Sequence, residues 1–296
     1  MHLSAHTWMR PEPLETTLQR LSRLGYSSIE LAGEPDQYSV EQVRPLLEKY
    51  NIECWGTVTV QHGARNLLAA DSQQRRSTID YMKEVVSLAA GLRGKIVTVV
   101  PGNVGTLVPD STPENEWKWA VEGLREVAAF AQEKHIRLAI EPLNRLETYF
   151  LNRAEQAVAL AKEVGHGCGI AFDVFHLAIE EKDMFEAMRT YGQYIVDVHV
   201  ADNNRLAPGN GSFDWPRIMA TLKETGYDGA VAVEAMPPID RTPLGKFGTL
   251  QLETGEVSIT PDQHDFIINH GSGLFSESYY SGIIARSAET LLPFLN

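Results

Sequence analysis

Short apolar runs alternate with longer amphipathic stretches along most of the chain. The runs are rich in Val and Ile and show little alternation of apolar and polar residues, which is typical of strands buried on both faces of a parallel sheet. They occupy residues 3–8, 28–31, 53–60, 96–100, 138–141, 169–173, 195–200 and 230–234. The pattern therefore predicts eight strands.

Helices are predicted between these strands, because the apolar residues there recur with helical spacing. The helical stretches are residues 17–25, 41–50, 77–90, 116–134, 153–164, 183–191 and 215–225. Asp214 is expected to cap the start of the last of these, ahead of Pro216, and Gly226 is expected to end it. Strict alternation of strands and helices requires right-handed crossovers between parallel strands. Eight such repeats favour an α/β fold of the closed (β/α)8 TIM barrel type. We expect a single domain over residues 1–296.

Residues 237–275 break this alternation. They are rich in Pro, Gly and Thr, with residues 257–260 and 266–268 as weak strand candidates. We predict a long irregular excursion here, followed by a last helix at residues 276–295. Since the excursion follows directly on the last strand, it could cover a site at that strand's end, reshape it for a larger substrate or contact another subunit.

The composition is that of an ordinary globular protein: 296 residues, of which 43% are apolar and 22% charged. The net charge of −13, without a dense Lys/Arg cluster, argues against nucleic acid or an anionic membrane as a partner. Cys54 and Cys168 fit no metal or redox spacing. No secretion-signal pattern and no apolar run of about 18 residues is found, so we expect a cytoplasmic protein that does not span a membrane.

Four consecutive predicted strands end on a side chain that can bind a metal ion. These side chains are Glu141, Asp173, His199 and Glu234. Barrel enzymes carry their sites at the carboxyl ends of the strands, so the four should converge, and converging carboxylates repel one another unless a cation neutralises them. Oxygen ligands with one imidazole suit Mn²⁺ or Mg²⁺, with Co²⁺ or Zn²⁺ possible. The alternative is that the acids end strands for solubility or cap the helices that follow.

The segments around these four residues resemble a known family. They are EPLNRLET at 141–148, FDVFHLAIEE at 172–181, HVADNNRLAPGNG at 199–211, and 226–234, which begins GYDG and ends on Glu234. They are similar to the ketose 3-epimerases, namely the D-tagatose and D-psicose 3-epimerases of the xylose-isomerase-like sugar isomerase/epimerase superfamily. The resemblance is good over residues 137–234, loose over the first half, and absent after residue 236.

The resemblance implies that the four strand-end residues hold one divalent ion, most commonly Mn²⁺. It also implies that Glu147, His176 and Arg205 contact substrate oxygens near C1–C3. The alternatives for these three are a solvated loop acid, a locally packed or capping histidine and a surface cation. The resemblance further suggests a homo-oligomer, either a dimer or a tetramer.

The implied reaction is that of a metal-dependent epimerase or isomerase acting on a keto-sugar. The proton next to the carbonyl would be abstracted through a metal-stabilised enediolate, with Glu141 and Glu234 removing and returning it from opposite faces. Asp197 shares a strand face with His199 and could bond to it or to buried water, and Glu30 could do the same. Three further residues could line the sugar pocket: His6, Trp8 and His62.

Three other functions are compatible with such a barrel. A lyase could cleave 3-oxo-glycosides by β-elimination, as the catalytic subunit of C-glycoside deglycosidases does, and would then work with a partner subunit in a hetero-oligomer. A DNA-repair endonuclease would need more histidine ligands and a basic groove, which the charge of −13 opposes. A metal-free sugar-binding protein would hold no tightly bound cation. Only Arg205 is available near the Gly209–Gly211 loop, so an unphosphorylated sugar is favoured over a sugar phosphate.

Overall fold

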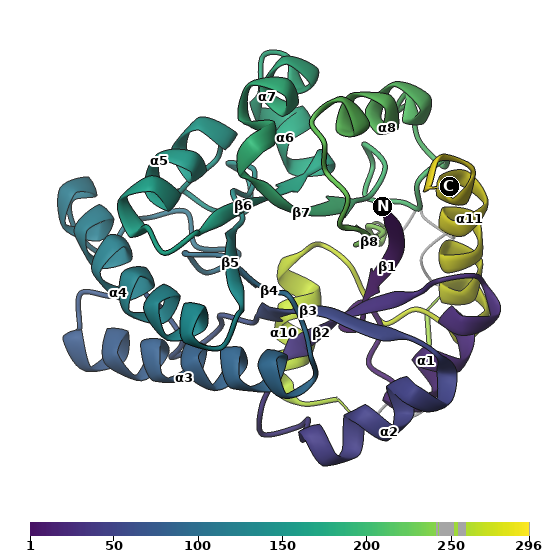
Figure 1. The fold of residues 1–296 in the computed structure, drawn as a ribbon, viewed down its shortest axis with the longest axis horizontal. Helices are drawn as coiled ribbons and strands as arrows, with labels where there is room; N and C mark the ends of the chain where they lie inside the picture. The colour runs from purple at the N-terminus through teal and green to yellow at the C-terminus, as the bar shows by residue number, and fades with distance from the viewer. Residues whose placement is uncertain (241, 243–251, 254–258, 296) are drawn as a thin grey trace.

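Eight parallel strands close into a barrel in the computed structural model, with β1 paired to β8 (Figure 1). The structure describes residues 1–240, 242, 252–253 and 259–295. The strands are β1 (His2–His6), β2 (Ser28–Gly33), β3 (Glu53–Thr59), β4 (Ile96–Val99), β5 (Arg137–Ile140), β6 (Gly169–Asp173), β7 (Ile195–Val200) and β8 (Ala230–Val233). All eight predicted strands are present, which confirms the predicted TIM barrel.

Helices surround the barrel, and α10 lies over one of its ends (Figure 1). They are α1 (Leu14–Arg23), α2 (Val40–Tyr50), α3 (Ser72–Gly91), α4 (Pro113–Glu133), α5 (Ala154–Val164), α6 (Val174–Glu180), α7 (Met184–Tyr191), the short 3-10 helix Gly192–Tyr194, α8 (Trp215–Glu224), α10 (Pro261–Asn269) and α11 (Glu277–Leu295). Asp214 caps α8 as predicted, by accepting a hydrogen bond from the Arg217 amide at 3.1 Å. Gly226 follows α8 with φ +79°, a conformation that glycine adopts without strain. None of the helices in the described ranges is long and apolar enough to cross a bilayer.

The prediction of a strand at residues 266–268 is wrong, because these residues lie inside α10. Thr260 and Gln263 form a reciprocal capping box at the start of this helix, and Pro261 occupies its first turn. These local signals favour a helix over the β propensity of a three-residue apolar run. Of the other strand candidate, residues 257–258 lie outside the described residues, and 259–260 are irregular chain before α10.

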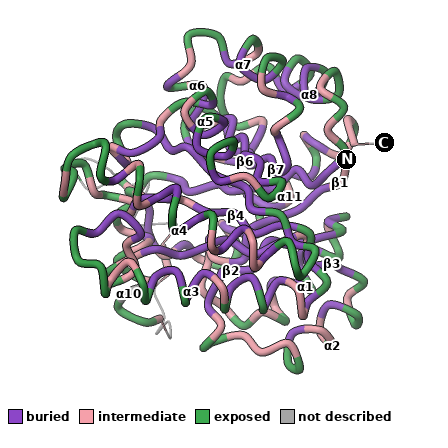
Figure 2. Tube along the Cα trace, turned by 60° about the vertical axis from the view of Figure 1, so that its left-hand side comes forward, coloured by how far each residue is buried: buried purple, intermediate pink, exposed green. Residues whose placement is uncertain are grey.

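The core lies inside the barrel and between its outer wall and the helices, as Figure 2 shows by the burial of the strands. Every residue of β2, β4, β6, β7 and β8 is buried, as expected for strands packed on both faces. α11 completes the ring of helices by packing beside β1 and α8. The Tyr26 hydroxyl, which follows α1, donates to the Ile284 carbonyl of α11 at 2.9 Å.

Strand register sets the position of the candidate site. Asp173 of β6 lies opposite His199 of β7, and His6 of β1 lies opposite Glu30 of β2. Two backbone bonds extend the ladder one residue beyond the strands, since the Glu141 amide donates to Val99 at 2.9 Å and the Glu234 amide donates to Val200 at 3.0 Å. The strands therefore deliver these side chains to one end of the barrel.

Candidate active site at the carboxyl ends of the strands

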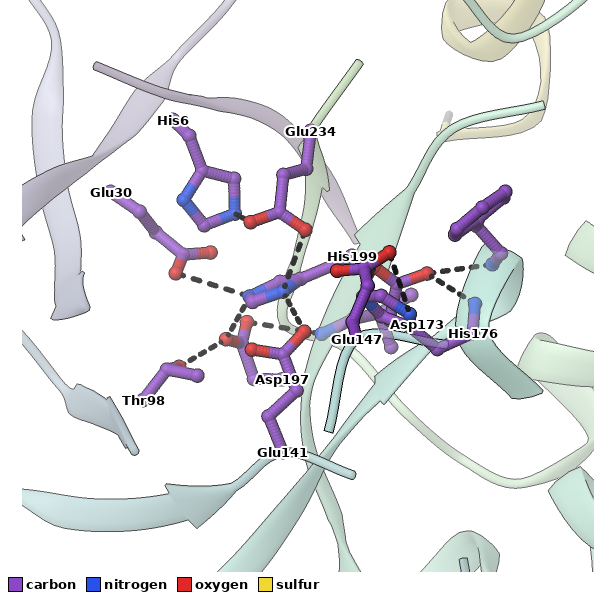
Figure 3. A network of polar contacts seen from close by, with 12 residues as sticks. His6, Glu30, Thr98, Glu141, Glu147, Asp173, His176, Asp197, His199 and Glu234 are labelled. Atoms are coloured by element: carbon purple, nitrogen blue, oxygen red, sulfur yellow. Dashed lines mark hydrogen bonds and ion pairs between the residues drawn. The ribbon is translucent and has the colours of Figure 1, made fainter. Parts of the chain in front are cut away.

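Three of the predicted ligands converge with a histidine at this end of the barrel (Figure 3). Glu141, Asp173, Glu234 and His176 each offer one ligand atom, and these atoms all lie within 4.8 Å of one another. All four residues are buried. Asp173 serves two purposes, because its Oδ1 caps α6 by accepting from the amides of Phe175 (2.6 Å) and His176 (3.2 Å). Its Oδ2 is buried and has no hydrogen-bond partner among the described residues, although Arg205 Nη1 lies 3.5 Å away, so this oxygen can serve as a ligand.

His199 approaches the same carboxylates from deeper in the barrel. Its Nδ1 lies 2.8 Å from Glu141 Oε1 and 3.7 Å from Glu234 Oε2. Its Nε2 lies 2.9 Å from Asp197 Oδ2 and 3.4 Å from Glu30 Oε2 (Figure 3). Asp197 and Glu30 thus hold the Nε2 side of the imidazole, which is the contact expected for these two acids, and Nδ1 faces the site. The role of His199 as a metal ligand remains a prediction.

Asp197 is itself held by two donors from the first half of the barrel. The Thr98 hydroxyl donates to its Oδ2 at 2.7 Å, and the Trp55 indole donates to its Oδ1 at 3.1 Å. Burial opposes ionisation of Asp197, but His199 and these hydrogen bonds lower its pKa overall. A charged, fully bonded Asp197 therefore fixes the ring of His199.

Arg205 connects the acids of the site with the predicted substrate contacts. Its Nη1 lies 3.5 Å from both Asp173 Oδ2 and Glu234 Oε2. Its Nη2 lies 3.0 Å from His176 Nε2 and 3.6 Å from Glu147 Oε2. The structure thus brings Glu147, His176 and Arg205 together, as expected. Arg205 has φ +61°, a left-handed conformation that is uncommon for a residue with a side chain and tends to occur at functional sites.

The loop that carries Arg205 is anchored by the buried carboxylate of Asp202. This carboxylate accepts from the amides of Asn203, Gly209 and Phe213 at 3.0, 2.8 and 3.1 Å, and from the Trp215 indole at 2.9 Å. A Cβ at Gly211 would lie only 2.1 Å from Asp202 Oδ1, so the loop also needs a glycine there. Asp202 therefore determines where Arg205 is placed.

The electrostatics of the site are dominated by buried acid. Burial, followed by the nearby Glu141, raises the pKa of Glu234 well above its usual range. Burial and Asp197 raise the pKa of Glu30 to about 8. Burial by itself would raise the pKa of Asp173. The positive charges of His176 and Arg205 outweigh burial, so the pKa of Asp173 is lowered overall. Crowded carboxyl groups with opposed pKa shifts are typical of sites that bind a cation or transfer protons.

A divalent cation fits this set of side chains. The convergent donors are carboxylate oxygens and imidazole nitrogens, which suit Mn²⁺ and similar metals. A metal at this place would neutralise the carboxylates of Glu141, Asp173 and Glu234, whose mutual repulsion otherwise opposes their ionisation.

The three expected pocket residues have different positions. His6 is fully buried, with its Nε2 3.9 Å from Glu234 Oε1 and its ring 4.4 Å from that of His199. Trp8 lines the small cavity into which Glu141 and Glu234 also project. His62 does not lie with Glu141, Asp173 and Glu234. Its Nε2 lies 3.7 Å from Glu34 Oε1, and both residues line a separate, larger cavity.

Besides the supports of Asp197 and the anchor Asp202, three further residues at the site were not among the predicted ones. Asn144 holds both Glu147 and His176, since its side-chain amide lies 2.9 Å from Glu147 Oε1 and 2.7 Å from His176 Nδ1. Phe266 and His270, from α10 and its end, line the same small cavity as Glu141 and Glu234. Asn144 lies in the EPLNRLET segment at 141–148, three residues after Glu141, and could have been found there. The other two lie in the excursion, where no strand end or periodicity marked them.

These features define a (β/α)8 barrel with an acid-rich site at the carboxyl ends of its strands. The chain matches the family described as xylose isomerase-like TIM barrel over residues 18–245, and it belongs to that family. It is 31% identical over 228 residues to D-psicose 3-epimerase of Enterocloster bolteae, covering 73% of this chain and 75% of that protein. This relationship confirms the resemblance to the ketose 3-epimerases.

Two further similarities extend this comparison. The chain is 24% identical over 235 residues to 3-dehydro-D-guloside 4-epimerase of Escherichia coli, covering 76% of this chain and 87% of that protein. The crystal structure of D-allulose 3-epimerase from Methylomonas sp. in complex with D-allulose superposes with a TM-score of 0.82 at 19% identity, covering 99% of this chain and 96% of that chain. At that identity the structural likeness establishes the fold alone.

Proposed function

We propose that this protein is a divalent-metal-dependent epimerase or isomerase that moves a proton on the carbon next to the ketone of a sugar. The observation that carries the proposal is the pair Glu141 and Glu234. Both are buried, both line one small cavity and both lie beside His199, and Glu234 also lies beside Arg205. Relatives that are named epimerases of ketoses and of a dehydro-guloside support the same chemistry.

Glu141, Asp173, His199 and Glu234 would hold one cation, with Mn²⁺ favoured and Mg²⁺ or Co²⁺ possible. His176 lies close enough to the three carboxylates to be an alternative ligand. When bound, the cation would withdraw electrons from the ketone and the adjacent hydroxyl and so acidify the neighbouring C–H bond.

The protein's own groups would then transfer the proton. Glu141 follows β5 and Glu234 follows β8, so the two carboxylates approach the space between them from different sides of the barrel. One carboxylate would take the proton from the sugar carbon and the other would return a proton to the opposite face, which inverts that centre. Arg205, held by the Asp202 loop, would donate to the sugar oxygen on which negative charge develops.

Proton exchange tests this proposal directly. The protein is loaded with Mn²⁺, dialysed, analysed for bound metal and incubated in D₂O with a panel of ketoses and 3-oxo-glucosides. We expect about one metal ion per chain and deuterium at one carbon next to the ketone, together with an epimeric or isomeric sugar. Metal-free protein that exchanges equally fast would contradict the role of the cation. Release of an aglycone together with an unsaturated sugar would show that the reaction is an elimination and would contradict epimerisation.

A further inference from the structure

Two cavities of very different size lie on either side of one aromatic partition at the site end of the barrel. The inner cavity, which Glu141 and Glu234 line, has an open volume of about 30 Å³. The outer cavity lies between α10 and the segments that follow β1, β2 and β3, and has about 760 Å³. Small-molecule sites usually measure about 300–1,000 Å³, so the outer cavity has the volume of a ligand site and the inner one alone does not.

The partition between them consists of Trp8 and Phe266, which line both cavities. Their rings meet edge to face with centroids 4.9 Å apart. The Trp8 indole nitrogen is buried and has no hydrogen-bond partner among the described residues. A buried indole N–H normally finds an acceptor, so this donor is available to an oxygen atom at the junction of the two cavities.

The outer cavity is lined by side chains suited to an uncharged ring. Trp8, Tyr38 and Phe266 supply aromatic surface. The charged groups of the lining are already paired: Glu34 accepts from both Nη atoms of Arg65 at 2.8 and 2.9 Å, and Arg10 pairs with Glu12 and Glu253. These pairs leave little excess charge for a phosphate or carboxylate, whereas their remaining lone pairs and N–H groups can bond to hydroxyls.

We propose that the substrate is a keto-sugar glycoside. Its ketone-bearing ring binds at the carboxylates, and its uncharged ring substituent occupies the outer cavity between α10 and the ends of β1–β3. Trp8 and Phe266 separate to join the two cavities, and the indole N–H of Trp8 bonds to the substrate near the link between the rings. This inference rests on the proposed function and adds the class of substrate to it.

The substituent can come from two sources, a second sugar or an aromatic aglycone, and matched substrates distinguish them. The rate of deuterium incorporation is measured for methyl, phenyl and glucosyl 3-oxo-glucosides and for the free ketoses D-fructose and D-psicose. We expect kcat/KM for the phenyl or the glucosyl compound to exceed that of the methyl compound by about tenfold or more, since burying one ring is worth at least that factor. The preferred member of the pair identifies the source.

A variant that fills the outer cavity supplies the second test. Gln37 lines this cavity yet is exposed, so Gln37→Trp should fold while narrowing the cavity. The matched control is Gln132→Trp, at an exposed position on α4 away from both cavities. We expect Gln37→Trp to raise KM for the ring-bearing glycoside about tenfold, to leave the methyl glycoside within about twofold, and to differ from the control.

The outcomes separate the two proposals. Exchange that is as fast with free ketoses or the methyl glycoside as with the ring-bearing glycosides overturns the glycoside inference and leaves the epimerase intact. An equal effect of Gln37→Trp on all substrates overturns it as well. Absence of metal-dependent exchange with every sugar overturns the proposed function and the inference together.

Discussion

The two halves of the barrel end carry different kinds of side chains. In the half formed by β5–β8, the acids and the histidine at the strand ends are buried against one another. β1 and β2 also end at or next to a histidine and an acid, but Glu34 is paired with Arg65 away from this cluster. In the half formed by β1–β3 and covered by α10, the lining is aromatic or consists of polar groups already paired, around a much larger cavity. Under our proposals, one half performs the chemistry and the other selects substrate size. Four predictions test this division, and the last of them concerns a residue outside both halves of the site.

The largest effect is expected at the two glutamates of the β5–β8 half. Glu141→Gln and Glu234→Gln keep the shape of the side chain but remove the base, so exchange should fall by about 10²–10⁴-fold for every substrate. Deuterium incorporation is measured by NMR, with bound metal determined on the same samples. The control is Glu289→Gln on the exposed face of α11. If a metal-loaded variant exchanged deuterium at the wild-type rate, the substituted glutamate would not be a base in the reaction.

Arg205 should show the next largest effect. Arg205→Lys keeps the charge but loses the planar fork that reaches Asp173, Glu234 and Glu147 together. We expect kcat to fall by about 10²-fold, with a smaller change in KM, because the donor acts mainly on charge that develops during the reaction. Arg205 stacks on the ring of Phe175. Arg217 stacks in the same way on the ring of Phe185 but lies outside the site, so Arg217→Lys is the matched control. Equal effects of the two substitutions would contradict the role of Arg205.

Asp202 should affect stability and activity together. Asp202→Asn replaces a carboxylate that accepts four hydrogen bonds with an amide that cannot accept all of them. The free energy of unfolding, measured by urea denaturation, should fall by about 2–3 kcal/mol. Exchange should decrease with all substrates alike, since Arg205 is displaced and the outer cavity is not. A selective loss with ring-bearing glycosides would contradict this placement.

The smallest effect is expected outside both cavities, between α3 and α4. Hydrogen bonds from Arg76 and Lys83 lower the pKa of Glu126 to about 2. Its carboxylate therefore stabilises the folded state at pH values above its unfolded pKa of about 4.3, and this contribution disappears as the pH falls toward 2. Because the ion pairs of Glu126 with Arg76 and Lys83 are partly exposed to solvent, Glu126→Gln should lower the free energy of unfolding by less than about 1 kcal/mol at pH 7. The difference from wild type should vanish near pH 2, and exchange should not change at pH 7.

The strands were predictable because burial on both faces leaves a direct record in the sequence as short apolar runs. The helices that were missed are short and begin at polar caps. α6 is seven residues long and is capped by Asp173, a residue predicted as a ligand, with helix capping as the alternative. α10 begins at the Thr260–Gln263 capping box, a local signal that was present but outweighed by the apolar run around Ile267. Both errors arose where a cap, rather than periodicity, marked the element.

The sequence by itself determined the alternation of strands and helices and the presence of an acid or histidine at the ends of β5–β8. These features depend on neighbouring residues and on strand direction, which follow from local patterns. Only the tertiary structure decided that His176 joins the carboxylates, that His199 turns Nδ1 toward Glu141, and that α10 packs on Trp8 to divide two cavities. Those arrangements depend on packing and charge between residues far apart in the chain, where many alternatives share the same local pattern.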